Sequence, residues 1–213
     1  MSDDLTGSIR ESYDRLADEY ARRLFDELRH KPFDRNQLDR FAAAVAGRGE
    51  VCDMGCGPGH VARYLRDAGA SVFGLDLSPR MLEQARLLNP DIRFQQGNML
   101  ALDLPDESLA GIAALYAIVN IPMQSLPAIF HEMQRVLQPG GLLLLSFHIG
   151  DGIMHSGDMW GLPVSMDYFG FQSSAIRQSI ESAGLAIEEV IERDPYPDVE
   201  FQSRRAYIFA RNP

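Results

Sequence analysis

The chain has 213 residues, of which 46% are hydrophobic and 23% charged, a composition typical of one soluble globular domain with a full core. Its 30 acidic and 20 basic side chains give a formal charge of −10, and such a surface argues against nucleic acid as a partner because it repels phosphate. The first residues are polar and acidic, unlike a signal peptide, and no apolar run approaches the length of a membrane span. The sequence therefore predicts a cytoplasmic protein that does not enter membranes.

The two cysteines, Cys52 and Cys56, lie close together in the chain. Two cysteines do not make a disulfide framework, and this spacing without further cysteines does not make a zinc site. We interpret both as small buried residues of a reduced protein.

Apolar residues at helical spacing predict two N-terminal helices that are joined near Lys31 and Pro32. From residue 50 onward the pattern alternates between strands and helices. Alternation of this kind implies parallel strands joined by right-handed crossovers. The predicted strands are 51–54, 71–77, 92–97, 109–117 and 142–148, and the predicted helices are 59–68, 79–88 and 126–137.

The last part of the chain breaks this alternation. After a predicted helix at 174–183, which Gly184 ends, two strands at 185–193 and 204–211 are separated only by a short loop. A connection this short permits an antiparallel pair and excludes a parallel crossover. We therefore predict one α/β domain at 1–213 with a seven-stranded, mostly parallel sheet, a C-terminal antiparallel hairpin, helices on both faces and an N-terminal helical cap at 1–46.

The stretch VCDMGCGPGH at 51–60 places three glycines at alternate positions after Asp53. Glycine accepts positive φ and lets a ligand approach the backbone, and the helix that follows presents free amides. Further along, Asp76 ends the second strand, where its carboxylate can accept hydrogen bonds from both ribose hydroxyls. Because Asp76 then faces ligand and not the core, we expect its replacement to leave the stability of the free protein unchanged.

Two ligands compete for such a nucleoside site. A dinucleotide fingerprint would use Gly57, Gly59 and Ala62, but it would bring Asp53 close to the pyrophosphate and leave Gly55 without a role. S-adenosylmethionine carries no phosphate and does carry an ammonium group, for which a carboxylate is favourable. The glycine pattern therefore favours S-adenosylmethionine over NAD.

Four stretches resemble those of class I S-adenosylmethionine-dependent methyltransferases of the small-molecule type: DMGCGPG at 53–59, GLDLSPRML at 74–82, GNML at 97–100 and VLQPGG at 136–141. The resemblance covers nearly the whole chain and implies a Rossmann-like fold, with S-adenosylmethionine as cofactor and S-adenosylhomocysteine as product. The residues that it assigns to the cofactor are Asp53 and Gly55 at the methionine end, Gly57 and Gly59 along the nucleoside, Asp76 at the ribose, Leu77 and Met81 on the adenine, Asn98 and Met99 at the adenine edge, Leu115 after the fourth strand, and Tyr13 and Tyr20 in an N-terminal segment that closes over the cofactor.

Three of these residues have structural alternatives. Asp76 could cap the helix that follows it, although Ser78 before Pro79 offers a better cap. Met81 stands at helical spacing with Ala85 and Leu88, which also fits a core position. Asn98 follows a glycine and also fits an ordinary turn.

Methyl transfer requires in-line placement of the acceptor and, for a protonated acceptor, removal of a proton. The fourth strand ends in Leu115-Tyr116-Ala117-Ile118 and not in the Asn/Asp-Pro-Pro-aromatic motif of exocyclic-amine methyltransferases. Neither the acidic ligands of magnesium-dependent catechol enzymes nor the three cysteines of radical enzymes are apparent. We therefore expect metal-free transfer to a small molecule.

Acceptor-facing residues are expected beyond the carboxyl ends of the fourth and fifth strands. The irregular stretch 150–171, rich in Gly, Met and aromatic residues, is predicted to form a lid over an apolar pocket, with a dimer contact as the alternative. His148 is the candidate general base, with a structural histidine as the alternative. The candidate substrate residues are Tyr116, Asn120, His148, Trp160 and Tyr168.

Two other functions stay open at this point. The chain could be a methyltransferase that acts on a protein or tRNA, against which the acidic charge and the apolar lid argue. It could also be an NAD-type or non-catalytic nucleotide-binding protein, against which Asp53 and Gly55 argue. The expected partner is thus a small-molecule acceptor, and the sequence leaves both a monomer and a homodimer open.

Overall fold

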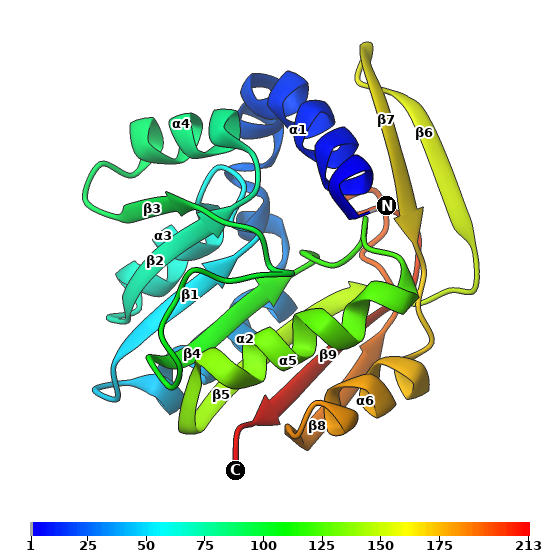
Figure 1. Ribbon diagram of the computed structural model, residues 1–213. Helices are drawn as coiled ribbons and strands as arrows, with labels where there is room; N and C mark the ends of the chain where they lie inside the picture. Colours follow the sequence, from blue (N-terminus) through cyan, green and yellow to red (C-terminus); the bar gives the residue numbers. More distant parts are fainter. Residues whose placement is uncertain (1) are drawn as a thin grey trace.

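A seven-stranded sheet forms the centre of the computed structural model, which describes residues 2–213 and their side chains from Thr6 onward (Figure 1). The strand order is β3-β2-β1-β4-β5-β9-β8. The first five strands pair in parallel, whereas β9 runs antiparallel to both β5 and β8. The strands are β1 (Glu50–Met54), β2 (Ser71–Asp76), β3 (Arg93–Gln96), β4 (Leu109–Leu115), β5 (Leu137–His148), β8 (Ala186–Arg193) and β9 (Arg205–Arg211). The predicted sheet and its C-terminal hairpin are confirmed.

Helices cover both faces of this sheet, as predicted. Successive strand residues point to opposite faces, so that Cys52 packs with α5 and α6 while Val51 packs with α2, α3 and α4. Both sets are buried, and the sheet therefore has a core on each side. The helices are α1 (Ser2–Leu24), η1 (Glu27–His30), α2 (Pro32–Val45), α3 (His60–Asp67), α4 (Pro79–Leu88), η2 (Met123–Ser125), α5 (Leu126–Val136) and α6 (Ser173–Ser182).

The segment 150–171 is more regular than the sequence suggested. It contains β6 (Ile153–Met159) and β7 (Leu162–Phe169), which form an antiparallel ribbon outside the main sheet. Trp160 and Gly161 make the turn with positive φ values of 57° and 82°, the conformation that suits a two-residue hairpin. The sequence reading missed this hairpin because β6 is exposed along most of its length and shows no alternation of apolar and polar residues.

The ribbon packs beside α1 (Figure 1). The Ser165 amide donates a hydrogen bond of 3.1 Å to Ser12 Oγ, and Leu16 packs with Val164 and Met166 in a small separate core. The roles of 1–46 as a cap and of 150–171 as a lid stay predictions. Across the part of the chain that the structure describes, no helix combines the length and the apolar character needed to cross a bilayer.

Candidate functional site

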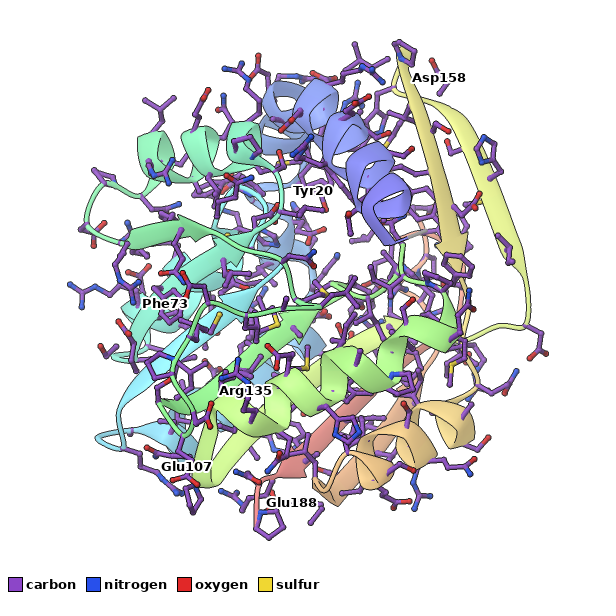
Figure 2. All side chains as sticks on the ribbon, viewed as in Figure 1. Tyr20, Phe73, Glu107, Arg135, Asp158 and Glu188 are labelled. Carbon is purple, nitrogen blue, oxygen red and sulfur yellow. The ribbon has the colours of Figure 1, made fainter. Side chains whose placement is uncertain are left out.

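A cavity lies at the carboxyl ends of β1, β2 and β4 and is bordered on the far side by α1 and η1. Its empty space is about 1070 Å³, with open solvent at the mouth included. Tyr20 reaches it from α1, above the edge of the sheet (Figure 2). Clefts at this edge of an open parallel sheet are the common ligand sites of such folds.

The Asp76 carboxylate borders this cavity and is held by two backbone amides. Its Oδ2 accepts a hydrogen bond from the Gly57 amide and its Oδ1 accepts one from the Ser78 amide, both of 2.8 Å. Burial raises the pKa of Asp76, and the amides of Ser78, Gly57 and Leu77 oppose that rise. Because a carboxylate offers about four lone-pair sites, each oxygen keeps one for a further donor, which is the arrangement that two ribose hydroxyls require.

Two glycines of the loop also border the cavity, and both have positive φ, 73° at Gly55 and 51° at Gly57. A Cβ on Gly55 would lie 2.7 Å from the Ala117 Cβ, so that this position must be a glycine for packing as well. A Cβ on Gly57 would meet only the Tyr20 ring, at 3.8 Å. Gly57 therefore keeps the backbone open on the side from which a ligand would approach.

The third glycine, Gly59, does not border the cavity, contrary to expectation. It has a φ of 82°, and a Cβ there would lie 2.8 Å from both the Phe94 ring and the Asn89 side-chain amide. Gly59 thus lets the start of α3 pack closely on β3, as the last glycine of related loops does.

Replacing Gly59 by alanine is expected to lower the free energy of unfolding by about 2 to 4 kcal/mol, since left-handed backbone strain and overpacking add. Gly57→Ala is the matched control, because it carries similar strain without the clash. Thermal unfolding of both variants measures the difference. A Gly59→Ala protein that is as stable as Gly57→Ala would contradict this assignment.

Asp53 also departs from expectation. It is 2% exposed in β1, and its Oδ2 accepts a 2.8 Å hydrogen bond from the Ala62 amide at the start of α3. Burial raises the pKa of Asp53 to about 7, against the opposing effects of the His60 charge and the Ala62 amide. The carboxylate anchors α3 and does not border the cavity, so its predicted contact with the methionine end has no geometric support.

The residues that the sequence assigns to the adenine end are brought together at the cavity wall. They are Leu77, Met81, Asn98, Met99 and Leu115. Met81 is almost fully buried and belongs to both the wall and the core. The Asn98 side-chain oxygen accepts a 3.0 Å hydrogen bond from the Leu100 amide and therefore shapes a turn, while Asn98 still borders the cavity. Their contacts with adenine stay predictions.

The N-terminal tyrosines reach the same cavity from α1. The Tyr13 hydroxyl donates a 2.7 Å hydrogen bond to the Asn120 side-chain oxygen, and the Asn120 side-chain nitrogen donates one of 2.8 Å to the Asp167 carbonyl. Asn120 thus links α1 to β7 and borders the cavity as well. Tyr20 packs against Trp160 at a ring distance of 5.9 Å. Trp160 and Tyr168 are not among the cavity-lining residues, in contrast to their predicted substrate role.

His148 likewise lies outside the cavity, behind Tyr116, at a ring distance of 5.0 Å. Its Nδ1 is 2.7 Å from Ser203 Oγ, in a side-chain hydrogen bond. Burial, together with the positive charges of Arg205 and Lys31, lowers the pKa of His148 to about 4. The structure therefore supports the structural alternative for His148 and not the general base.

Three residues with carboxylate or imidazole side chains border the cavity and were not predicted from the sequence: Glu27, Asp34 and His60. Glu27 Oε2 lies 2.6 Å from Lys31 Nζ, and Glu27 Oε1 lies 3.1 Å from His60 Nε2. Burial favours the neutral form of Glu27, but the hydrogen bond and charge of His60 together with Lys31 lower its pKa to about 2. The buried His60 Nδ1 has no hydrogen-bond partner among the described residues. The position of His60 directly after the glycine loop is the sequence signal that could have indicated it.

This group of residues fits S-adenosylmethionine. The free lone pairs of Asp76 suit ribose, the open backbone at Gly57 suits a nucleoside, and Glu27 with His60 offers partners for an amino acid group. Among residues 6–213, no three or more His, Cys, Asp or Glu side chains gather in a way that could hold a metal ion. Metal-free transfer stays a prediction.

Comparison with known proteins shows which proteins this chain resembles. The profile of a family described as "Methyltransferase domain" matches residues 51–141. A malonyl-[acyl-carrier protein] O-methyltransferase of Enterobacter lignolyticus is 32% identical over 138 residues, which cover 62% of this chain and 52% of that protein. A demethylmenaquinone methyltransferase of Tropheryma whipplei is 32% identical over 146 residues, which cover 66% of this chain and 59% of that protein. The chain is similar to class I S-adenosylmethionine-dependent methyltransferases.

The cofactor of the proteins that this chain resembles is S-adenosylmethionine. The fold of this chain is similar to that of a solved S-adenosylmethionine-dependent methyltransferase from Methanosarcina mazei, with a TM-score of 0.69 and 18% identity, covering 76% of this chain and 91% of the other. The chain spans about half the length of the curated relatives that it matches.

Proposed function

We propose that the protein transfers the methyl group of S-adenosylmethionine to a small-molecule acceptor without a metal ion. The observation that carries this proposal is the Asp76 carboxylate, which two amides fix at the cavity wall while a lone pair on each oxygen stays free. Bound there, S-adenosylmethionine supplies an activated methyl group, so the protein's task is to orient both reactants and exclude water.

The acceptor end of the cavity is formed by Tyr116, Ala117, Asn120 and Ile121. These residues follow β4, where an acceptor would lie beyond the cofactor's methyl group. The similar proteins are named for a malonyl group on an acyl-carrier protein, a demethylmenaquinone and a sterol, which are chemically diverse acceptors. The choice of a small molecule therefore rests on the presence of this cavity and on the acidic charge of the chain.

A panel of ligands tests the proposal directly. S-adenosylmethionine and S-adenosylhomocysteine should each raise the melting temperature, because a ligand at about 100 times its Kd adds about 2.7 kcal/mol of stability. NAD should have no effect. Stabilisation by NAD alone would contradict the proposal and favour the dinucleotide alternative.

The methionine end of the ligand is expected at Glu27 and His60. Glu27→Gln should weaken the binding of S-adenosylhomocysteine about tenfold, because the carboxylate can accept a charge-assisted hydrogen bond from the ligand's ammonium group. The same variant should bind methylthioadenosine as the wild type does, since that ligand lacks the amino acid. Isothermal titration calorimetry measures both affinities.

Glu83→Gln is the matched control, because Glu83 is exposed on α4 and does not border the cavity. Equal losses for both ligands in Glu27→Gln would indicate a general disturbance of the site and would argue against this orientation. If the wild type binds neither ligand, the proposed function itself is wrong.

A further inference from the structure

The acceptor end of the cavity contains a chain of three hydroxyl and carboxyl groups that cofactor binding does not use. The Tyr116 hydroxyl lies 3.0 Å from the Tyr207 hydroxyl, and the Tyr207 hydroxyl lies 3.0 Å from Asp34 Oδ1. Tyr116 and Asp34 border the cavity, whereas Tyr207 lies behind them and is fully buried. We call this group the Tyr116–Tyr207–Asp34 chain.

The direction of the hydrogen bonds in this chain follows from its chemistry. An ionised carboxylate only accepts, so Tyr207 donates to Asp34, and Tyr116 must then donate to Tyr207. Arg205 Nε donates a 3.0 Å hydrogen bond to the Tyr116 oxygen, and Arg193 donates one of 2.9 Å to the Tyr207 oxygen. The Tyr116 oxygen therefore keeps one free lone pair, and its proton points toward the Tyr207 hydroxyl, which in turn donates to the Asp34 carboxylate.

The end of the chain is suited to receive a proton. Burial raises the pKa of Asp34, and the charges of Lys31 and Arg193 only partly oppose the rise. Burial also raises the pKa of Tyr116, with a further contribution from Asp34. Tyr116 is therefore suited to pass a proton onward and not to hold a negative charge.

The backbone at Tyr116 is a second, independent observation. Its φ of 55° lies in the left-handed region, which is uncommon for an aromatic residue and occurs mainly at functional sites. The Tyr116 amide is held by the Ser146 carbonyl at 3.0 Å and by Ser146 Oγ at 3.1 Å. This conformation keeps the Tyr116 side chain at the cavity wall with its hydroxyl on Tyr207 and Arg205.

The charges around the chain restrict the acceptor. Lys31 is paired with Glu27, Arg193 and Arg205 share the Glu200 carboxylate, and Arg193 also pairs with Asp34, so each of these cations already has an acidic partner. A carboxylate acceptor would also meet the Asp34 charge at the cavity wall.

An ammonium acceptor is disfavoured for the opposite reason. It would have to approach the Tyr116 oxygen, beside which the Arg205 guanidinium lies. A neutral hydroxyl avoids both repulsions. As the hydroxyl loses its proton, negative charge develops on its oxygen, and Arg205 stabilises that charge.

We propose that the acceptor is an uncharged hydroxyl compound whose proton leaves through the Tyr116–Tyr207–Asp34 chain. The proposal rests on the proposed methyl transfer. The acceptor oxygen forms a bond to the methyl carbon, and the bond between that carbon and sulfur breaks with both electrons going to sulfur. The acceptor proton passes to the Tyr116 oxygen, the Tyr116 proton passes to Tyr207, and the Tyr207 proton passes to Asp34 Oδ1. After the product leaves, Asp34 returns the proton along the same three groups, and Tyr116 releases it to water in the open cavity.

Other titratable groups face this chain and enter any interpretation of its pH dependence. They are Glu27 in η1, Lys31 directly after η1, His148 in β5, Arg193 in β8, Glu200 in the loop after β8, and Arg205 in β9.

A binding experiment tests the proposal without turnover. The probe is 4-nitrophenol, whose absorbance separates its neutral from its ionised form, added to the protein saturated with S-adenosylhomocysteine. In the wild type the bound probe should ionise at a pH at least one unit lower than the free probe, because the chain accepts its proton. Tyr207→Phe should abolish this shift, since phenylalanine keeps the ring contact with Phe33 but cannot relay a proton.

Turnover with two phenols gives an independent readout. With 4-methylphenol, which keeps its proton in solution, Tyr207→Phe should lower kcat at least about tenfold. With ionised 4-nitrophenol at alkaline pH, the same variant should keep its kcat within about twofold of the wild type, because no proton has to leave. Asp34→Asn should repeat the pattern. Tyr64→Phe, which removes an exposed hydroxyl bonded to Asp39, is the matched control and should have no effect.

The affinity for S-adenosylhomocysteine shows whether each variant is folded. The proposal is overturned if the bound probe ionises as it does in solution, if both phenols lose rate equally in both variants, or if the wild type methylates no hydroxyl probe. If the wild type does not bind S-adenosylhomocysteine, the proposed methyl transfer is wrong as well. If it binds S-adenosylhomocysteine but gives one of the results above, only the proposed proton path is wrong.

Discussion

Asp76→Ala should reduce the affinity for S-adenosylhomocysteine by about a hundredfold. Each free lone pair of the carboxylate can accept a ribose hydroxyl in a charge-assisted hydrogen bond worth about 1.5 kcal/mol or more, and two such bonds correspond to at least about 3 kcal/mol. Asp76→Asn keeps one acceptor oxygen and should lose less. Isothermal titration calorimetry of both variants measures the effect.

The structure changes what is expected of the free protein. Because Asp76 holds the amides of Gly57 and Ser78, its removal leaves two donors without their partner, at about 1 to 3 kcal/mol each where they stay buried. The sequence-based expectation of unchanged stability is therefore wrong, and Asp76→Ala should melt below the wild type. A folded Asp76→Ala protein with wild-type affinity for S-adenosylhomocysteine would refute the ribose role of this residue.

The elements of the sheet were predictable because their patterns are local. Buried parallel strands read as short apolar runs, and Ser78 before Pro79 marks the start of α4, where the Ser78 hydroxyl accepts a hydrogen bond of 3.0 Å from the Met81 amide. The β6–β7 ribbon carries no such pattern. It packs against α1, which lies far away in the sequence.

The candidate site was predictable only in part, for a similar reason. The alternating glycines indicate a loop at a ligand site, but the spacing does not say that Gly57 faces the cavity while Gly59 faces Phe94. His148 ends a strand at the expected edge, yet the ring of Tyr116 lies between it and the cavity. Such outcomes depend on side-chain direction and not on position in the chain.

The polar network behind the acceptor end was not predictable at all. Asp34 belongs to α2, Tyr116 follows β4, and Tyr207 belongs to β9, so their meeting depends on the sheet order. No local motif joins them. Their types, a carboxylate and two phenols, are also common at solvent-exposed positions, and only burial makes their contacts significant.

Glu200→Ala should cause the largest loss of stability, about 3 to 5 kcal/mol. The Glu200 side chain is fully buried and lies 2.8 Å from Arg193 and 2.9 Å from Arg205, and it also accepts a 2.8 Å hydrogen bond from the Tyr196 amide. Its removal leaves Arg205 buried without an ion-pair partner and Arg193 with Asp34 alone. For a chain of this length the loss corresponds to a fall in melting temperature of about 10 °C.

Glu192→Ala is the matched control, because Glu192 pairs with Arg204 at the surface, where such a pair contributes at most about 1 kcal/mol. The pH dependence gives a further check. Burial alone would raise the pKa of Glu200, but the hydrogen bonds from Arg193 and Tyr196 and the charge of Arg205 hold it below its ordinary value. The stabilisation is therefore complete above the unfolded pKa of about 4.3 and is lost as the pH falls through the folded value. The difference in melting temperature between the wild type and Glu200→Ala should narrow in acid, and a difference that is independent of pH would show that Glu200 acts through packing and not through its charge.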